Sequence, residues 1–135
     1  MLGQVSQNHH LNDTWCIEIL RRIRWPEGVR CIWCDRREVR RHSKSRDGRQ
    51  RYKCGCDPGT FTDLTGTVFA RSNLPLSTWF RCLRLMGQGL STAKMARALG
   101  VKWDTALHMR RRLGPALADC SWLHRLREIL IREGF

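Results

Sequence analysis

Two pairs of cysteines constrain the fold of this 135-residue chain more than any other feature of its sequence. Two residues separate Cys31 from Cys34, one residue separates Cys54 from Cys56, and residues 35–53 lie between the pairs. A tight turn brings the thiolates of each pair together, and Zn²⁺ takes four such ligands in a tetrahedron at about 2.3 Å. The spacing therefore predicts a zinc ribbon in which the metal, Zn²⁺, is structural.

The second cysteine pair is shorter than the usual knuckle, in which at least two residues separate the ligands. Gly55 is the residue between Cys54 and Cys56, and we expect glycine to permit the narrow turn. Asp57 and His42 are alternative fourth ligands. Cys56 is favoured over both, because thiolate is the preferred ligand of structural zinc.

The other cysteines, and the compartment that cysteine usage implies, agree with metal binding. Seven cysteines are an odd number, and the polar segment Met1–Asn12 has no secretory signal. We therefore expect a cytoplasmic setting, where paired cysteines bind metal more often than they form disulfides. Cys16, Cys82 and Cys120 fall in helical patterns and are expected to be small buried residues.

The charge of the chain indicates a polyanionic partner. It has 25 Lys and Arg against 12 Asp and Glu, a net charge of +13 with a pI near 10.7. Nucleic acid is the commonest such partner of a small basic protein. A membrane surface is the competing partner, but the charge is not gathered on one amphipathic helix. No run approaches the ~18 apolar residues of a membrane span, and we expect neither a membrane partner nor a small-molecule substrate.

The stretch between the cysteine pairs is predicted to be a basic β-hairpin. Glu38–Ser43 and Arg49–Cys54 have strand character, Asp47-Gly48 is a hairpin turn signal, and Thr60–Thr62 is a short third strand. Its cations are interpreted as DNA-backbone contacts, with a merely solvated surface as the alternative. Those predicted contacts are Arg40, Arg41, Lys44, Arg46, Arg49, Arg51 and Lys53.

Two aromatic residues of the predicted ribbon have two interpretations. Trp33 and Tyr52 could stack on nucleic-acid bases, or they could pack the small ribbon core.

A helix is predicted before the ribbon. Asp13 is its expected N-cap and Arg24 its last residue, with an apolar face of Trp15, Ile19 and Ile23. Its last turn is basic, which suits either the helix dipole or a phosphate contact. The cations concerned are Arg21, Arg22 and Arg24.

The second half of the chain is predicted to be helical. Ser77 is the expected N-cap of a helix over Thr78–Gln88, and Ser91 that of a helix over Thr92–Leu99. A last amphipathic helix is expected over Ala116–Glu133.

A helix-turn-helix is predicted where Gly100 ends the helix that follows Ser91. The second helix is expected from about Lys102 to Leu113, with Ala96, Val101, Ala106 and Met109 seating it. If this helix enters the major groove, its early outward residues reach bases and its later arginines hold phosphates. Packing or an ordinary surface position is the alternative for Trp103 and His108. The outward residues are Lys102, Trp103, Thr105, His108, Arg111 and Arg112.

The order of these motifs resembles insertion-sequence transposases that have an N-terminal transposase zinc ribbon and a helix-turn-helix. The resemblance covers roughly Asp13 to Leu117, and the segments that carry it are Trp25–Cys31, Arg51–Cys54, Phe61–Phe69, Leu74–Leu76 with Trp79, and Thr105–Met109. It implies that the region recognises duplex DNA, such as the terminal inverted repeats of a mobile element. The second knuckle departs from the family pattern.

Catalysis is not expected from this chain. In the family that the chain resembles, catalysis belongs to a further, RNase-H-like domain, whose acidic triad binds two metal ions. Such a domain needs on the order of a hundred residues, more than follow the predicted helix-turn-helix. The acids Asp119, Glu128 and Glu133 lie together in one predicted helical tail. We expect a non-enzymatic chain, with three alternatives left open: a truncated transposase gene, a domesticated remnant, or one subunit of a split system. Its expected protein partner is a second copy of the chain or a separate catalytic subunit.

Taken together, the sequence predicts an α+β chain in four parts. These are an N-terminal helix (1–24), the zinc ribbon (25–70), the helix-turn-helix (71–117) and a C-terminal helix (118–135). The alternative function is a protein-interaction or transcription-regulator module, which pairs with a catalytic partner through Trp15, Trp79 and Trp122.

Overall fold

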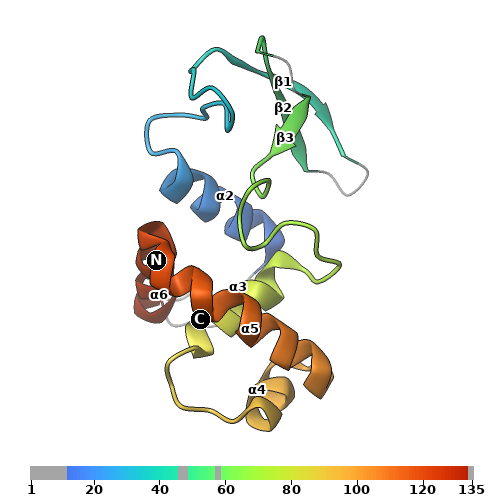
Figure 1. Ribbon diagram of the computed structural model, residues 1–135, viewed down its shortest axis with the longest axis vertical. Coiled ribbons are helices and arrows are strands. Elements are labelled where there is room, and N and C mark those ends of the chain that lie inside the picture. The colour runs from blue at the N-terminus through green and yellow to red at the C-terminus, as the bar shows by residue number, and fades with distance from the viewer. Residues whose placement is uncertain (1–11, 46–48, 57–58, 134–135) are drawn as a thin grey trace.

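The computed structural model describes residues 12–45, 49–56 and 59–133. Over these residues the fold is α+β, with five helices and one three-stranded antiparallel sheet of order β1-β2-β3 (Figure 1). In chain order the elements are α2 (Asp13–Arg24), β1 (Val39–Lys44), β2 (Gln50–Cys54), β3 (Thr60–Thr62), α3 (Leu76–Leu85), α4 (Thr92–Leu99), α5 (Trp103–Asp119) and α6 (Ser121–Glu133).

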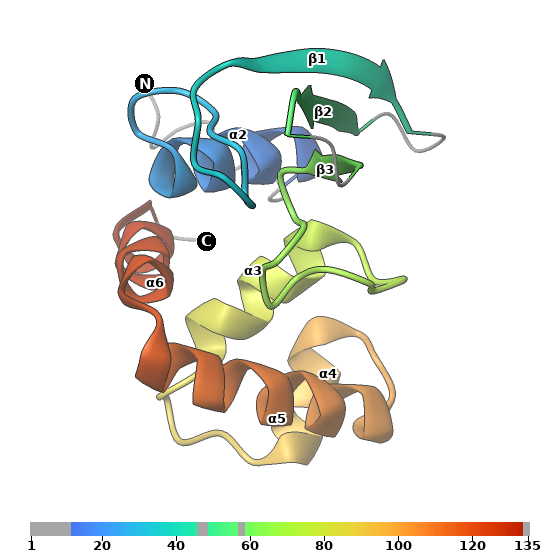
Figure 2. The same ribbon diagram turned by 45° about the horizontal axis from the view of Figure 1, so that its top comes forward.

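The sheet and the helices each have their own hydrophobic core. The ribbon core consists of Cys31, Tyr52, Cys54 and Phe61, whereas the helical core draws on α2, α3, α4, α5 and α6. Both views place the sheet at one end of the long axis and the α4–α5 pair toward the other (Figures 1 and 2). Helix α2 lies between the sheet and the remaining helices (Figure 2).

The sheet agrees with the sequence prediction to within one residue at its strand ends. Val39 pairs with Cys54, and a bulge lies between Arg41 and Ser43, so His42 has no partner in the β1–β2 register. The third strand has the predicted bounds. The predicted turn Asp47-Gly48 lies outside the described residues.

The N-caps predicted for two helices are wrong, and one contact explains both errors. Asn12, not Asp13, caps α2, because its Oδ1 accepts the N–H of Trp15 at 2.8 Å. The Asp13 carboxylate instead accepts the backbone N–H of Ser77 at 2.9 Å. Helix α3 begins at Leu76, its own cap residue Pro75 offers no side-chain bond, and α2 satisfies one of its free N–H groups.

Other helix boundaries also differ from the prediction: α3 ends at Leu85 and not at Gln88. Helix α5 runs to Asp119 through Pro115, although proline removes one backbone hydrogen bond. Ala116 and Leu117 pack against the helical core, and this contact supports the helix beyond the proline. The predicted tail helix over 116–133 is therefore divided at the extended residue Cys120.

The fully buried residues of α2 are not those of the predicted apolar face; each follows a predicted residue by one position. Cys16 and Leu20 are fully buried. The predicted face is half-buried and packs at the edge of the helical core; it consists of Trp15, Ile19 and Ile23.

A buried carboxylate joins the ribbon to α2. Asp63, 1% exposed, accepts Nε and Nη2 of Arg21, each at 2.9 Å, and the hydroxyl of Tyr52 at 3.0 Å. Arg24 donates to the carbonyls of Asp63 at 2.8 Å and Thr65 at 2.5 Å. Burial raises the pKa of Tyr52 to about 12 and lowers that of Arg24. We call this network the Asp63 joint.

The Asp63 joint changes the interpretation of the basic end of α2. Arg21 and Arg24 were predicted to be a solvated helix end or phosphate contacts, but their guanidinium groups hold the ribbon. Arg22 is the exposed cation of that turn.

We predict that Asp63→Asn lowers the free energy of unfolding by about 3 kcal/mol, because it leaves the partly buried Arg21 without its counter-charge. Chemical denaturation of the metal-loaded protein measures the change. Glu27→Gln is the control: Glu27 pairs with Arg37 at 2.7 Å, but both side chains are more than half exposed, so less than about 1 kcal/mol is expected. Equal effects of the two substitutions would contradict a special role for the joint.

Candidate metal centre and basic surfaces

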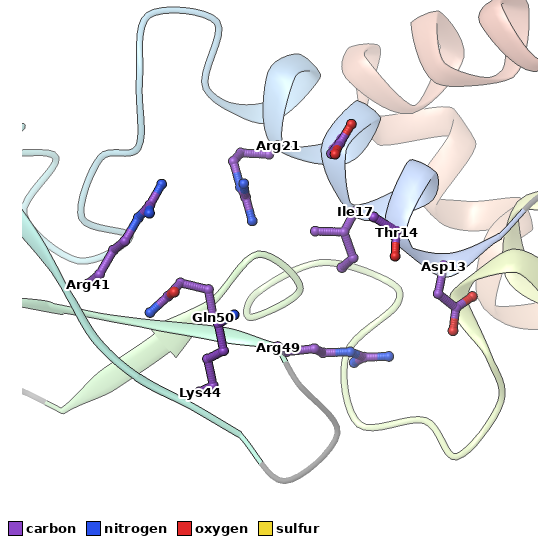
Figure 3. A pocket seen from close by; sticks show the side chains of 9 residues that line it. Asp13, Thr14, Ile17, Arg21, Arg41, Lys44, Arg49 and Gln50 are labelled. Atoms are coloured by element: carbon purple, nitrogen blue, oxygen red, sulfur yellow. The ribbon is translucent and has the colours of Figure 1, made fainter.

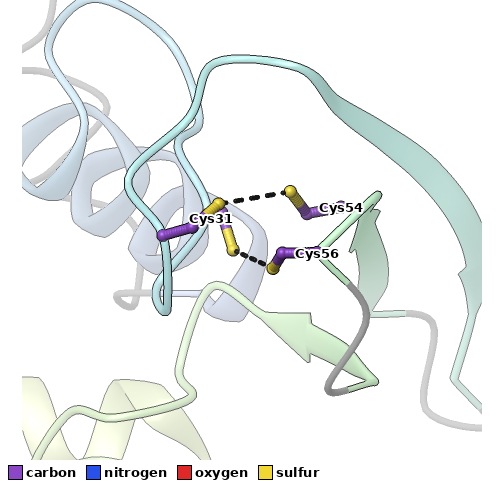
Figure 4. Close-up of side chains that lie close together, drawn as sticks. Cys31, Cys54 and Cys56 are labelled. Atoms are coloured by element: carbon purple, nitrogen blue, oxygen red, sulfur yellow. Dashed lines mark hydrogen bonds between the residues drawn. The ribbon is translucent and has the colours of Figure 1, made fainter.

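The four predicted cysteine ligands come together at one end of the ribbon. Their Sγ atoms all lie within 4.8 Å of one another, and two Sγ–Sγ distances, Cys31–Cys56 and Cys34–Cys54, are 3.5 Å (Figure 4). A disulfide requires about 2.05 Å, and all four cysteines are free. Tetrahedral bonds of about 2.3 Å place sulfur atoms roughly 3.8 Å apart. The cluster is therefore positioned to bind a metal ion.

Backbone hydrogen bonds close the first knuckle into a turn, and a backbone N–H of this turn points at the sulfur of Cys31. Cys31 N–H donates to the Arg36 carbonyl at 3.0 Å, and Asp35 N–H donates to the Cys31 carbonyl at 2.9 Å. Trp33 N–H lies 3.4 Å from the Cys31 sulfur. Burial raises the pKa of the Cys31 thiol, but backbone N–H groups of Cys34 and Trp33 and the neighbouring thiols outweigh it, lowering the pKa to about 7. Cys31 therefore ionises more readily than Cys56, whose pKa desolvation and the neighbouring thiols raise to about 12; the thiolate is the form that binds metal.

The second knuckle does not need its glycine. Gly55 lies outside the left-handed region of backbone space, and a Cβ built on it meets nothing within 4 Å. The expectation that glycine permits this turn is therefore wrong. The left-handed residue is instead Asp35, at φ 62°, directly after the first knuckle. Of the alternative ligands, His42 lies on β1 outside the cluster, and Asp57 falls outside the described residues.

We predict that Cys34→Ser abolishes tight metal binding and unfolds the ribbon, while the helical core, which contains none of the four ligands, keeps its structure. Metal analysis of the purified protein and far-UV circular dichroism measure the two effects. Cys120→Ser, at the break between α5 and α6, should retain the full metal content. Full metal content in Cys34→Ser would refute the site.

We predict that Gly55→Ala changes the unfolding free energy by less than about 0.5 kcal/mol, because the added methyl group enters open space. Thermal unfolding with metal bound tests this. Gly100→Ala is the matched control: Gly100 has φ 70°, so its substitution should destabilise the protein by about 1 kcal/mol. A Gly55→Ala variant as unstable as Gly100→Ala would contradict this description.

The hairpin presents most of the predicted DNA contacts to solvent. Arg40, Arg41, Lys44 and Arg51 are exposed, whereas Arg49 and Lys53 are half-buried. Arg46 lies outside the described residues. One side of the hairpin faces α2 across a cleft of about 390 Å³, where cations of β1 and Arg49, just before β2, meet the acids of α2 (Figure 3). The charged residues of that cleft are Asp13, Glu18, Arg21, Arg41, Lys44 and Arg49.

Helices α4 and α5 are joined by the turn that the sequence predicts. Ser91 caps α4 through the N–H of Lys94 at 3.1 Å. At its other end Gly100 is left-handed, and Val101 N–H donates to the Ala96 carbonyl at 3.0 Å, the pattern of a Schellman motif. Residues of α5 that were predicted to seat it are fully buried, namely Ala106 and Met109.

Most of the residues that were predicted to point outward from α5 are exposed in the structure. Lys102, Trp103, His108 and Arg111 are exposed, and Thr105 is half-buried. Arg112 is turned inward, contrary to the prediction. It donates to the Ala70 carbonyl at 2.5 Å, and its guanidinium carbon lies 5.5 Å from the Trp79 ring centre.

Sequence reasoning missed the exposed cations of α4 and misplaced one aromatic surface. Lys94 and Arg97 are exposed on α4, and their spacing between the buried Met95, Ala96 and Leu99 was the available signal. Trp79, proposed for partner binding, is 1% exposed and belongs to the helical core. Trp15 and Trp122 are half-buried and pack against that same core.

Comparison with known proteins links the chain to mobile DNA. A segment of 62 residues, 46% of this chain, is 44% identical to an uncharacterised protein in transposable element ISH50 of Halobacterium salinarum. That segment spans 21% of the relative's length. No protein-family model and no solved structure matches the chain. Within the described residues, no helix is long and apolar enough to cross a membrane.

Proposed function

We propose that this chain is the DNA-recognition part of a transposase-like protein, and that its metal is a structural Zn²⁺. The observation that carries the proposal is the four-thiol cluster at the base of an exposed basic hairpin. An all-thiolate tetrahedron is the donor set of structural zinc, and such a site stabilises a fold too small to be stable on its own core. The transposable-element relative supports the same context.

The two basic surfaces contribute differently to binding in this proposal. Exposed arginines and lysines of β1 and β2 contact phosphates, which gives affinity without sequence preference. Helix α5, seated on α4 by Gly100, presents Lys102, Trp103 and Thr105 at its N-terminal end, where a recognition helix meets base edges. Arg111 follows two turns later and suits a phosphate.

The position of these surfaces suggests a bipartite footprint. The sheet lies at one end of the long axis, and α4 and α5 lie toward the other (Figure 1). We propose that hairpin and helix contact separate segments of one duplex, such as a terminal inverted repeat.

We propose that DNA strand transfer requires carboxylates from outside residues 12–133. Asp119 ends α5, whereas Glu128 and Glu133 belong to α6. Among the residues that the structure describes, the cysteines are the one group of three or more His, Cys, Asp or Glu side chains placed to hold a metal. The described residues would thus supply binding, and carboxylates from elsewhere would supply two-metal chemistry.

We predict salt-sensitive duplex binding with a slope of log K against log salt of about −0.9 per phosphate contacted. Fluorescence anisotropy over a salt series measures it. A hairpin variant (Arg40→Gln with Arg51→Gln) and a helix variant (Lys102→Gln with Arg111→Gln) should each flatten the slope. Arg125→Gln with Arg132→Gln removes the same charge from exposed positions on α6 and should not.

Footprinting then tests the bipartite arrangement. The hairpin variant should lose protection of one DNA segment, and the helix variant that of the other. Absent or salt-independent duplex binding would refute the proposed function and favour a protein-interaction module.

A further inference from the structure

A second cleft lies beside the first knuckle and is lined by aromatic rings. Its volume is about 680 Å³, within the range of small-molecule sites. The walls come from the end of α2, the Cys31–Cys34 knuckle and α6. The aromatic and cationic residues that line it are Arg24, Trp25, Arg30, Trp33 and Trp122.

Trp33 is the accessible aromatic surface of this cleft. Its ring meets Phe61 in a T-shaped contact with centroids 5.7 Å apart, yet 46% of the residue remains exposed. Tyr52 is 4% exposed and its hydroxyl is bound to Asp63, so it belongs to the ribbon core. Trp25 is stacked by the Arg24 guanidinium at 4.5 Å. Trp33 and Tyr52 were the two residues predicted to stack on bases, and in the structure Trp33 is the accessible one of the two.

Arg30 supplies an unused donor in the same cleft. Its Nε is buried and has no hydrogen-bond partner, and the nearest carboxylate oxygen, on Asp35, is 3.6 Å away. A buried donor without an acceptor is unfavourable. The other acid of the cleft, Glu27, is already paired with Arg37. The cleft therefore offers an exposed indole ring next to a guanidinium whose Nε makes no hydrogen bond and whose counter-charge, on the exposed Asp35, is 3.6 Å away.

We propose that this cleft binds an unpaired nucleobase of the DNA, which stacks on Trp33 while Arg30 binds its phosphate. The inference rests on the proposed DNA-binding function and adds a substrate feature to it: a single-stranded or flipped-out nucleotide. Stacking on an aromatic ring tolerates any base, because every base has a π-face. The cleft would thus distinguish opened DNA from closed duplex, whatever its sequence.

Three DNAs of one sequence test the proposal at fixed salt. They are a blunt duplex, the same duplex with a four-nucleotide single-stranded extension, and the same duplex with one internal bulged base. Anisotropy should show roughly tenfold tighter binding of the extended or bulged DNA than of the blunt duplex. Preference for the extension places the site at a DNA end, and preference for the bulge places it at a flipped base.

Two variants of Trp33, with one control variant, test whether the preference for unpaired bases arises in the cleft. Trp33→Leu keeps apolar bulk but removes the stacking ring, and it should abolish the preference while blunt-duplex affinity is unchanged. Trp33→Tyr should retain most of it. Trp103→Leu, at the other exposed tryptophan, should lower affinity for all three DNAs alike. Metal content verifies that each ribbon is folded.

The outcomes separate this inference from the proposed function. Equal wild-type affinity for all three DNAs overturns the unpaired-base site and leaves duplex binding standing. Binding to the extended or bulged DNA with none to the blunt duplex overturns duplex recognition and supports the cleft, whereas no binding to any of the three DNAs overturns both. A preference that survives in folded Trp33→Leu also overturns the assignment to this cleft.

Discussion

The position of the ribbon on the helices depends on one buried carboxylate, Asp63. It follows β3 directly, and it binds a side chain from each body: Arg21 of α2 and Tyr52 of β2. Burying a charge is unfavourable unless that charge is paired and fully hydrogen-bonded, and here both carboxylate oxygens accept bonds. Since two hydrophobic cores meet at this point, the bidentate pair fixes an orientation that apolar contact alone would leave less defined.

Internal hydrogen bonds explain why net charge overstates the basic surface. Several arginines donate to carbonyls within the protein rather than facing solvent. Arg24 binds Asp63 and Thr65, Arg110 binds the Leu90 carbonyl, and Arg112 binds that of Ala70. A guanidinium has five donors in a fixed fork, so it can bind loop carbonyls that would otherwise lack partners. The cations left for a polyanion are concentrated on the hairpin, on α4 and on the first half of α5.

Local signals in the sequence predicted the features that local chemistry determines. The cysteine spacing located the thiol cluster, and Ser91 and Gly100 fixed both ends of α4, because caps and left-handed turns depend on a few adjacent residues. The errors involve contacts between distant residues. The Arg21–Asp63 pair spans 42 residues and the Asp13–Ser77 bond spans 64. Neither the inward turn of Arg112 nor the cleft beside Trp33 can be inferred from residue spacing, since both depend on how ribbon and helices pack.

The bond from Asp13 to Ser77 has a consequence for how such a chain can vary. It joins the first turns of α2 and α3, which also pack together in one core. The whole ribbon is therefore an excursion that leaves the helical body at the end of α2 and returns at the start of α3. Because the bond closes this excursion at its base, the contact between α2 and α3 does not depend on the length or the charge of the hairpin.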